Sequence, residues 1–186
     1  MTADGKIVDK ETVDPTALGV VLITDNQRIL ISKADATDGT NTKLYWGKNL
    51  KGKDIAGITE ITNQPVVQTD FNGKANTQAI IAAYTEHGVD MDSRDMCKVL
   101  ESYTEGGFTD WYVPAAGQLY EMYNKISDIN AALQNIGGTA LESDVYWSSS
   151  EYSKDNAWRA YFSSGIISYD LYGKNYSGRV RLVLDI

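Results

Sequence analysis

The sequence AWRAYFSSGIISYDLYGKNYSG (157–178), followed by RVRLVLDI (179–186), ends the 186-residue chain. In AWRAYFS, apolar side chains alternate with polar or amphipathic ones. This period of two predicts a β-strand with one face buried in the core. The predicted inward residues are Trp158, Ala160 and Phe162, and the predicted outward residues are Arg159, Tyr161 and Ser163.

The rest of this region predicts a turn, an ambiguous stretch and a final strand. Gly165 permits a turn, and between residues 166 and 172 apolar side chains occupy both possible faces, so the inward set there stays open. Residues 173–178 have the composition of a loop. Alternation resumes at Val180, Leu182 and Leu184. We therefore expect a terminal strand that is buried on one side.

Two β-branched apolar runs near the start of the chain predict a β-hairpin. LGVVLIT (18–24) and QRILISK (27–33) are separated only by Asp25 and Asn26, which suit a tight turn. KLYWGKN (43–49) predicts a further short strand.

The middle of the chain has helical periodicity instead. One predicted helix has Asn76 or Thr77 as its N-cap, and a second covers SRDMCKVLESY (93–103). The remaining predictions are a helix with Pro114 as its first residue and a helix capped by Ser127 or Asp128 and closed by Gly137 and Gly138. Strands, then helices, then strands predict an α+β domain whose last strand pairs near the first.

Length and composition predict one folded domain without a membrane span. We expect residues 1–17, which are polar and acidic, to be a flexible leader and residues 18–186 to be a single domain. The longest apolar runs are too short for a transmembrane helix, and no secretory signal is visible. A net charge of -8 argues against nucleic acid as a partner. The one cysteine, Cys97, lies in an apolar register, which favours a buried thiol over a reactive one.

The outward positions near the end of the chain are rich in Tyr, Ser, Gly and Asn. Tyrosine offers a large, rigid contact area, and Ser, Gly and Asn adapt their hydrogen bonds, as in antibody combining sites. This composition favours binding over catalysis. Tyr and Ser are also common on ordinary exposed β-surfaces, so composition alone leaves the two interpretations balanced.

A family resemblance favours the binding interpretation. The order DFNGKANTQAII (70–81), DWYVPAAGQLYEMYNKISDINAALQNIGG (110–138), YWSSSEYSKDNAWRAYFSSG (146–165), a lysine and finally VRLV (180–183) resembles bacterial and phage proteins with the C-type lectin fold. Specifically, it resembles the variable proteins that are diversified by retroelements, together with their fixed-sequence relatives. The similarity spans about residues 18–186. It implies a C-type lectin-like fold with short antiparallel strands and helices and with paired terminal strands.

The resemblance also implies a division of the region at about 146–181 into fixed and variable positions. In that family, adenine-directed mutagenesis rewrites codons near the 3′ end of the gene, and the altered residues form a ligand-binding surface. The fixed positions, here termed the framework set, would be Tyr146, Trp147, Ser148, Ser149, Ala157, Trp158, Phe162, Gly165, Lys174, Val180 and Arg181.

The predicted ligand-binding residues are termed the candidate surface. They are Tyr152, Ser153, Asn156, Arg159, Tyr161, Ser163, Ile166, Ser168, Tyr169, Leu171, Tyr172, Asn175 and Tyr176. The expected partner is a protein or glycan ligand on a target surface, with the chain displayed on a phage tail or a bacterial cell surface. The alternative is a fixed-sequence adhesive or structural lectin-fold domain of a bacterial surface fibre.

No catalytic, cofactor or metal site is expected. A single cysteine does not supply the reactive pair of formylglycine-generating oxidases, which share the broader fold. The Glu-Pro-Asn or Gln-Pro-Asp and Trp-Asn-Asp motifs of calcium-dependent animal lectins are missing from the sequence. Asp90, Asp92 and Asp95 resemble the start of a calcium loop but lack its glycine and closing glutamate, so turn and cap roles are expected. His87, the one histidine, has no recognisable nucleophile to pair with and is expected at a helix C-terminus.

Overall fold

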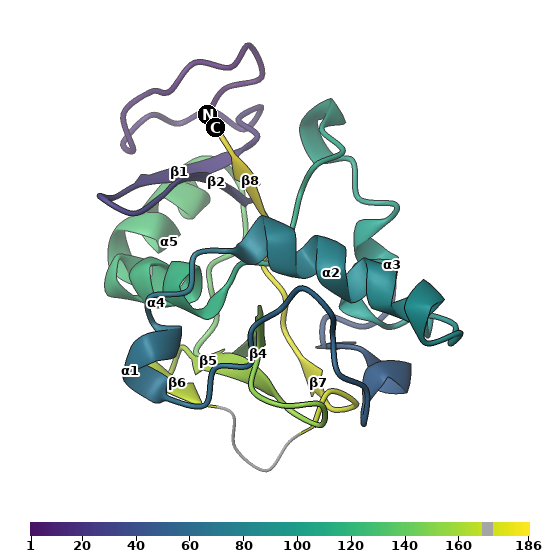
Figure 1. The fold of residues 1–186 in the computed structure, drawn as a ribbon. Coiled ribbons are helices and arrows are strands. Elements are labelled where there is room, and N and C mark those ends of the chain that lie inside the picture. Colours follow the sequence, from purple (N-terminus) through teal and green to yellow (C-terminus); the bar gives the residue numbers. More distant parts are fainter. Residues whose placement is uncertain (169–172) are drawn as a thin grey trace.

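The computed structural model describes residues 1–168 and 173–186, in which short strands form three small antiparallel sheets (Figure 1). The first sheet has the order β1-β2-β8, with bounds Gly19–Ile23, Arg28–Ser32 and Val183–Asp185. The second joins β3 (Leu44–Tyr45) to β7 (Ser177–Gly178). The third has the order β4-β5-β6, with bounds Val145–Glu151, Ala157–Tyr161 and Ile166–Ser168.

Helices lie between the early and late strands of the chain. They are α1 (Gln64–Val67), α2 (Gly73–Glu86), α3 (Met96–Leu100), α4 (Ala116–Asn124) and α5 (Ile126–Asn135), with short 3-10 turns η1 (Lys48–Leu50) and η2 (Glu105–Gly107). This mixture of helices and antiparallel strands confirms the predicted α+β class.

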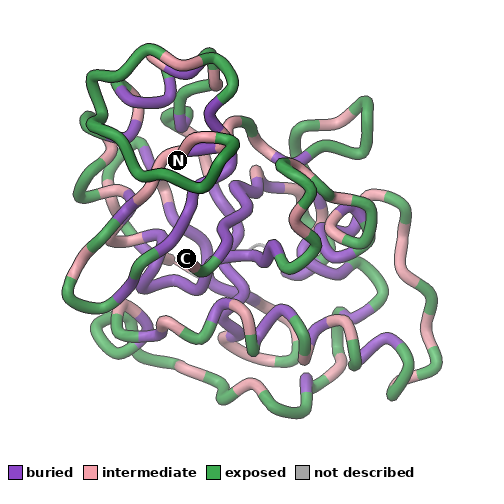
Figure 2. Tube along the Cα trace, turned by 90° about the horizontal axis from the view of Figure 1, so that it is seen from above, coloured by how far each residue is buried: buried purple, intermediate pink, exposed green. Residues whose placement is uncertain are grey.

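The first sheet joins strands from the early and late parts of the sequence. β1 and β2 form the predicted hairpin, and Thr24 N–H donates to the Gln27 carbonyl at 2.9 Å across the Asp25–Asn26 turn. β8 pairs with β2 on its other side, with Leu30 opposite Leu184. The N- and C-termini overlap in the view of Figure 1 but lie apart in the perpendicular view of Figure 2. The expected pairing of the last strand near the first is confirmed.

The third sheet lies between two apolar clusters. Trp158, Ala160 and Phe162 are buried together with residues of α4 and α5, as the sequence period predicted. Trp147 and Ala157 belong to a second cluster with residues of α2 and α3. In Figure 2 the trace is buried through the middle of the molecule and exposed at the outer loops. Both faces of the β4-β5 pair therefore contribute to packing.

The final strand is shorter than predicted and is buried on both sides. β8 spans Val183–Asp185, whereas alternation began at Val180. Residues 180–184 are all buried, including Arg181, whose guanidinium donates to the Asp35 carboxylate at 2.8 Å. The period of two identified the apolar positions. The opposite face is buried as well, because Asp35 satisfies the charge of Arg181 there.

Three predicted helix starts are wrong. α2 begins at Gly73, before Asn76 and Thr77, so these side chains cannot cap it. Asn76 donates to Asp70 (3.1 Å), and Thr77 donates to the Gly73 carbonyl one turn earlier in the helix (2.8 Å). Pro114 lies in extended chain ahead of α4, and its carbonyl accepts from Ser149 N–H at 2.9 Å.

The start of α5 differs for a simpler reason. Only Lys125 separates α4 from α5, so Ser127 and Asp128 fall within the first turn and cannot cap it. The predicted end is confirmed, since Gly137 has φ of 69° directly after the helix C-cap Ile136.

Residues 1–17 contain no helix or strand and arch over β1 at the top of Figure 1. The Met1 ammonium donates to the Gly19 carbonyl at 2.7 Å, and Lys10 pairs with Asp128 of α5 at 2.6 Å. A domain boundary at residue 17 stays a prediction. Within the described residues, no helix has the length and apolar character that a membrane span requires.

Candidate ligand-binding surface

One part of the candidate surface is formed by the turn after β4 and the loop before β7. Tyr152, Ser153 and Asn156 lie in the turn that joins β4 to β5. Asn156 forms an isolated bridge with Gly173, and Lys174 N–H donates to the Asp155 carbonyl at 2.9 Å. Residues 175 and 176, which follow directly, therefore lie beside the turn even though they are about twenty residues away in sequence.

A second part surrounds the β5-β6 hairpin at the other end of β5. Tyr161 pairs with Ile166, and Ser163 lies in the connecting turn. Gly165 completes this turn with φ of 72°. Figure 1 places β6 and the turn after β4 at opposite sides of the lower end of the molecule. The two parts are therefore held at the two ends of one short strand.

The described members of the candidate surface differ in exposure. The exposed members are Ser163, Ile166, Asn175 and Tyr176. The half-buried members are Tyr152, Ser153, Asn156, Tyr161 and Ser168. Ile166 and Ile167 settle part of the ambiguous stretch, because Ile166 is 51% exposed and Ile167 is buried. Tyr169, Leu171 and Tyr172 lie outside the described residues.

The prediction that Arg159 points into solvent is wrong, since its exposed fraction is only 4%. Arg159 pairs with Trp147 across β4 and β5, and its guanidinium lies 5.0 Å from the centre of the Trp147 ring. It also donates to the Tyr161 hydroxyl at 3.0 Å. The period of two correctly placed Arg159 and Trp158 on different faces of β5. The face that carries Arg159 is also buried, however. Arg159 therefore supports the candidate surface from beneath.

Tyr152 is also partly a packing residue. Its ring meets the ring of Trp158 edge to face, with 5.5 Å between centroids, and it packs against the first apolar cluster. Such aromatic contacts limit the rotamers of an exposed ring and lower the entropy lost on binding.

The framework set is buried almost completely. Of its eleven members only Gly165 is half-buried, and the other ten are buried. Their polar groups have partners: Ser148 donates to the Trp158 carbonyl at 2.8 Å, and the indole N–H of Trp147 donates to the Leu44 carbonyl at 3.1 Å. The positions that the resemblance implied to be fixed are thus the positions that packing constrains.

A family model for the Lcl C-terminal domain matches residues 35–184, which include the whole third sheet and the whole candidate surface. The chain belongs to the Lcl C-terminal domain family. The match begins after β2, so the β1-β2 hairpin lies outside it.

A solved structure shares the fold of this Lcl C-terminal domain. It is a fimbrial protein from Bacteroides ovatus ATCC 8483, with a TM-score of 0.59 and 18% sequence identity. The similarity covers 86% of this chain but 36% of the fimbrial protein, so the chain spans about a third of that protein. Comparison with curated proteins gives no match.

Two ionic groups that involve buried residues were missed by sequence reasoning. Glu151, the last residue of β4, pairs with Lys174 in the interior. Asp35 accepts from both Arg179 (2.9 Å) and Arg181 (2.8 Å). These partners are far apart in sequence, and a charged residue in a polar-looking loop carries no local signal of burial. The one signal in the sequence was that the family resemblance implied Lys174 and Arg181 to be fixed positions.

Acidic residues and the lone histidine have structural roles. The Asp95 carboxylate accepts from the backbone N–H groups of Lys48 and Asp92 and from the Tyr84 hydroxyl, each at 2.8 Å. This turn role confirms the prediction for Asp95. His87 is the C-cap of α2, as expected. Among the described residues, no three His, Cys, Asp or Glu side chains gather as a metal site would need. Cys97 is fully buried, and burial raises the pKa of its thiol.

Proposed function

We propose that this Lcl C-terminal domain is a ligand-binding domain of the surface-adhesion type, which recognises a protein or glycan on a target surface through the candidate surface. The observation that carries the proposal is the separation of two interleaved residue sets. In the third sheet and the chain that follows it, ten of the eleven framework residues are buried, while Ile166 and Tyr176 are exposed and Tyr161 is half-buried. A packed scaffold with a Tyr- and Ser-rich exterior suits recognition better than catalysis.

The fold neighbour supports display at a cell surface, because it is a fimbrial protein. We accordingly propose a bacterial cell surface or a phage tail as the location. The net charge of -8 favours a neutral or cationic ligand over a polyanion.

A binding experiment with matched variants tests the proposal. The purified chain is applied to a glycan array and to immobilised surface proteins of candidate target cells. For a ligand found in this way, Tyr161→Ala and Tyr176→Ala should each weaken binding by about 2 kcal/mol if they are anchors. Tyr176→Phe should retain most of the affinity because the ring contributes most of the contact area.

The control is Gln78→Ala, an exposed position on α2 away from the third sheet, which should leave binding unchanged. If binding is found but is indifferent to Tyr152→Ala, Tyr161→Ala and Tyr176→Ala together, then the candidate surface is not the site. Thermal unfolding of each variant separates lost contacts from lost folding.

We further propose that the exposed positions are diversified by a retroelement. The family resemblance supports this, and the neighbouring DNA tests it. A reverse-transcriptase gene and a near-copy of the 3′ coding end, differing only at adenines, should lie beside the gene.

The second candidate is a fixed-sequence adhesive or structural domain of a surface fibre, which the fimbrial neighbour favours. In that case the retroelement would be missing, and the candidate surface would contact another subunit of the fibre. Cross-linking of an assembled fibre through a cysteine placed at Tyr176 would then trap a neighbouring subunit.

A further inference from the structure

The outer edge of β1 carries backbone groups that no described residue satisfies. β1 pairs with β2 on one side only. Hydrogen bonds in an antiparallel pair alternate along the strand. Because Thr24 bonds to Gln27 across the turn, Leu22 and Val20 face β2, and the N–H and C=O groups of Val21 and Ile23 point away from it. Among the hydrogen bonds of residues 1–168 and 173–186, none reaches these four groups.

The Gly19 carbonyl confirms this direction. Gly19 is the next outward residue of β1, and its carbonyl accepts from the Met1 ammonium at 2.7 Å. On the outer edge of β1, the carbonyl of the first residue, Gly19, thus already accepts a hydrogen bond. The backbone groups of Val21 and Ile23 on the same edge have no such partner among the described residues.

An apolar groove runs along the same edge. Its volume is about 230 Å³, and it lies between β1 and the N-terminal segment, with Ala132 of α5 and the C-cap residue Ile136 also in its lining. Ile7 and Val8 line the other side and are 45% and 40% exposed. Ile23, at the end of β1, is 58% exposed. The groove therefore offers apolar contacts directly beside unsatisfied backbone groups.

Apart from the N-terminal segment that arches over it, the strand lacks the side-chain and backbone devices that protect an edge. Natural edge strands carry lysines, prolines, bulges or inward charges that prevent pairing with other chains. β1 reads GVVLI, and its register with β2 runs without a shift from Gly19 to Ile23. A regular apolar edge of five residues without such devices is a template for strand addition.

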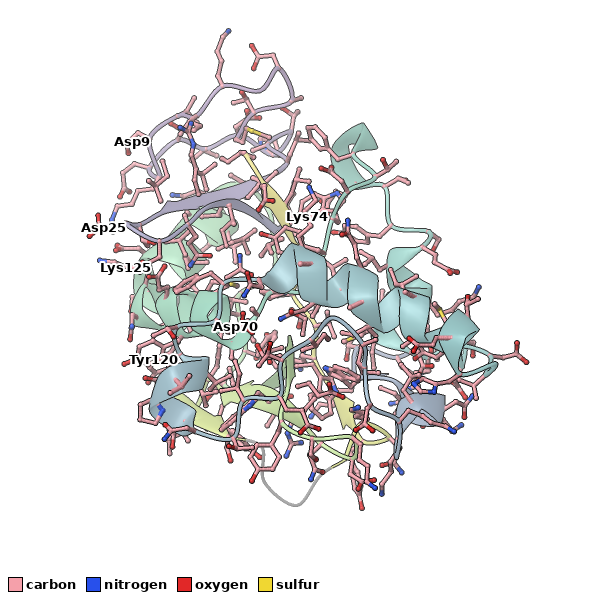
Figure 3. All side chains as sticks on the ribbon, in the orientation of Figure 1. Asp9, Asp25, Asp70, Lys74, Tyr120 and Lys125 are labelled. Carbon is pink, nitrogen blue, oxygen red and sulfur yellow. The ribbon has the colours of Figure 1, made fainter. Side chains whose placement is uncertain are left out.

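We propose that the outer edge of β1 binds an extended peptide segment of a partner protein, which adds as a strand and places alternate apolar side chains in the groove. An extended peptide backbone can pair with all four open groups, whereas an apolar small molecule would have to displace their water without replacing its hydrogen bonds. The remaining side chains of the partner segment are basic. Asp9 and Asp14 line the groove, and the ammonium of its one lysine, Lys10, is paired with Asp128 at 2.6 Å. Asp9 and Asp25 lie at this side of the molecule together with Lys125 (Figure 3), and the whole chain carries a net charge of -8.

The same charge argues against a second copy of the chain as the occupant. Two copies joined edge to edge would bring together two bodies with a charge of -8 each, whereas a basic segment is attracted to the edge. In Figure 1 the edge lies at the top and the candidate surface at the bottom. A partner at β1 therefore leaves the candidate surface accessible, and this inference does not depend on the proposed function.

The probe is the peptide acetyl-Lys-Val-Lys-Val-Thr-Val-amide, titrated up to about 1 mM into the full chain and followed by amide NMR and hydrogen exchange. We expect shifts confined to β1, the N-terminal segment and α5. We also expect the amide protons of Val21 and Ile23 to exchange rapidly in the free chain and slowly with peptide present. The same peptide with all its amide nitrogens methylated should not bind, because it retains the side chains but cannot donate to β1.

Two variants and one control complete the test. Val21→Pro removes an outward N–H, which an edge strand tolerates, and Ile23→Lys places a positive charge at the edge; each should weaken peptide binding roughly tenfold or more. The control is Val66→Lys, an equivalent change at a position 52% exposed on α1, at the other end of the molecule. It should bind as the unmodified chain does.

Several outcomes would overturn the proposal. They are equal binding of the methylated peptide, shifts centred elsewhere, protection of Val21 and Ile23 in the free chain, and no binding at the highest concentration. Concentration-dependent dimerisation that Ile23→Lys abolishes would assign the edge to a second copy instead. If Val21→Pro does not fold, Ile23→Lys and the methylated peptide still decide the question.

Discussion

Glu151 and Lys174 form a hydrogen-bonded ion pair with side chains that are 1% and 0% exposed. The Lys174 ammonium also donates to the Lys53 carbonyl at 3.0 Å and lies 4.9 Å from the centre of the Trp46 ring. Burial raises the pKa of Glu151 and lowers that of Lys174, and the charge of each partner opposes these shifts. The pair fastens the loop that carries Asn175 and Tyr176 to the end of β4.

Removing one partner of this pair should strongly destabilise the fold. We expect Lys174→Met to lower the free energy of unfolding by about 3–5 kcal/mol, because it leaves an uncompensated buried carboxylate. Urea unfolding at neutral pH measures the change. The double variant Glu151→Met with Lys174→Met should recover most of the loss, since no buried charge remains. A loss below about 1 kcal/mol in the single variant would show that the pair is hydrated in solution.

Gly165 should not tolerate a side chain. Its φ is 72°, and a Cβ atom there would lie 2.1 Å from Cε1 of Tyr123. Gly165→Ala therefore combines backbone strain with a clash, and we expect a loss of about 2–4 kcal/mol in urea unfolding.

Gly39→Ala separates these two contributions. Gly39 has φ of 92°, but a Cβ atom there meets nothing within 4 Å. Strain alone should lower the free energy of unfolding by about 1–2 kcal/mol. Equal losses for Gly39→Ala and Gly165→Ala would mean that the β5-β6 turn moves away from Tyr123.

Asp144 should make the stability of the fold depend on acid pH. Burial raises the pKa of this carboxyl, but hydrogen bonds from Lys43 and Arg179 outweigh it and hold the pKa at about 2, below the ordinary 3.8. The folded state thus binds fewer protons than the unfolded state in this interval. The stabilisation is complete above about pH 4 and is lost as the pH falls toward about 2. We expect its size to be about 1 kcal/mol after solvent screening.

Urea unfolding at several pH values checks this dependence. Asp144→Asn should be less stable than the unmodified chain at pH 7, and the difference should shrink between pH 4 and pH 2. Lys43→Met should remove part of the same dependence, because it removes one of the two side-chain donors. Parallel profiles for the unmodified chain and Asp144→Asn would contradict the assignment.

Local signals predicted the parts of the fold that local interactions determine. The β1-β2 hairpin was predictable because its turn and its two apolar runs are adjacent in sequence. The helix starts were not, because Asn76 and Thr77 have the side chains of N-caps but lie inside α2, where Asn76 donates to Asp70 and Thr77 exchanges hydrogen bonds with the backbone of Val113. The N-cap propensity of Asn and Thr shows only that these residues can begin a helix. Tertiary packing decides whether they do so in a given protein.

For the candidate site, the sequence predicted correctly which framework residues are buried. It predicted less well which of the other residues are exposed to solvent. Trp158 and Phe162 are buried as the period of two requires. The period identifies which residues share a face but does not tell whether another segment covers that face. This is why Arg159 was expected in solvent, and why the pairing of Glu151 with Lys174, 23 residues later, was missed.

The sequence predicted Arg159 in solvent, whereas the structure places it over the Trp147 ring, and stability measurements can distinguish the two positions. If the guanidinium lies over Trp147 in solution, Arg159→Lys should lower the free energy of unfolding by about 1–2 kcal/mol, since a lysine keeps the charge but not the planar stacking. Tyr161→Phe removes the hydroxyl that accepts from Arg159 and should cost about 1 kcal/mol. Urea unfolding followed by tryptophan fluorescence measures both changes. If Arg159→Lys leaves the stability unchanged, Arg159 does not stack on Trp147 in solution. It would then face solvent, as the sequence predicted, and could contact the ligand directly.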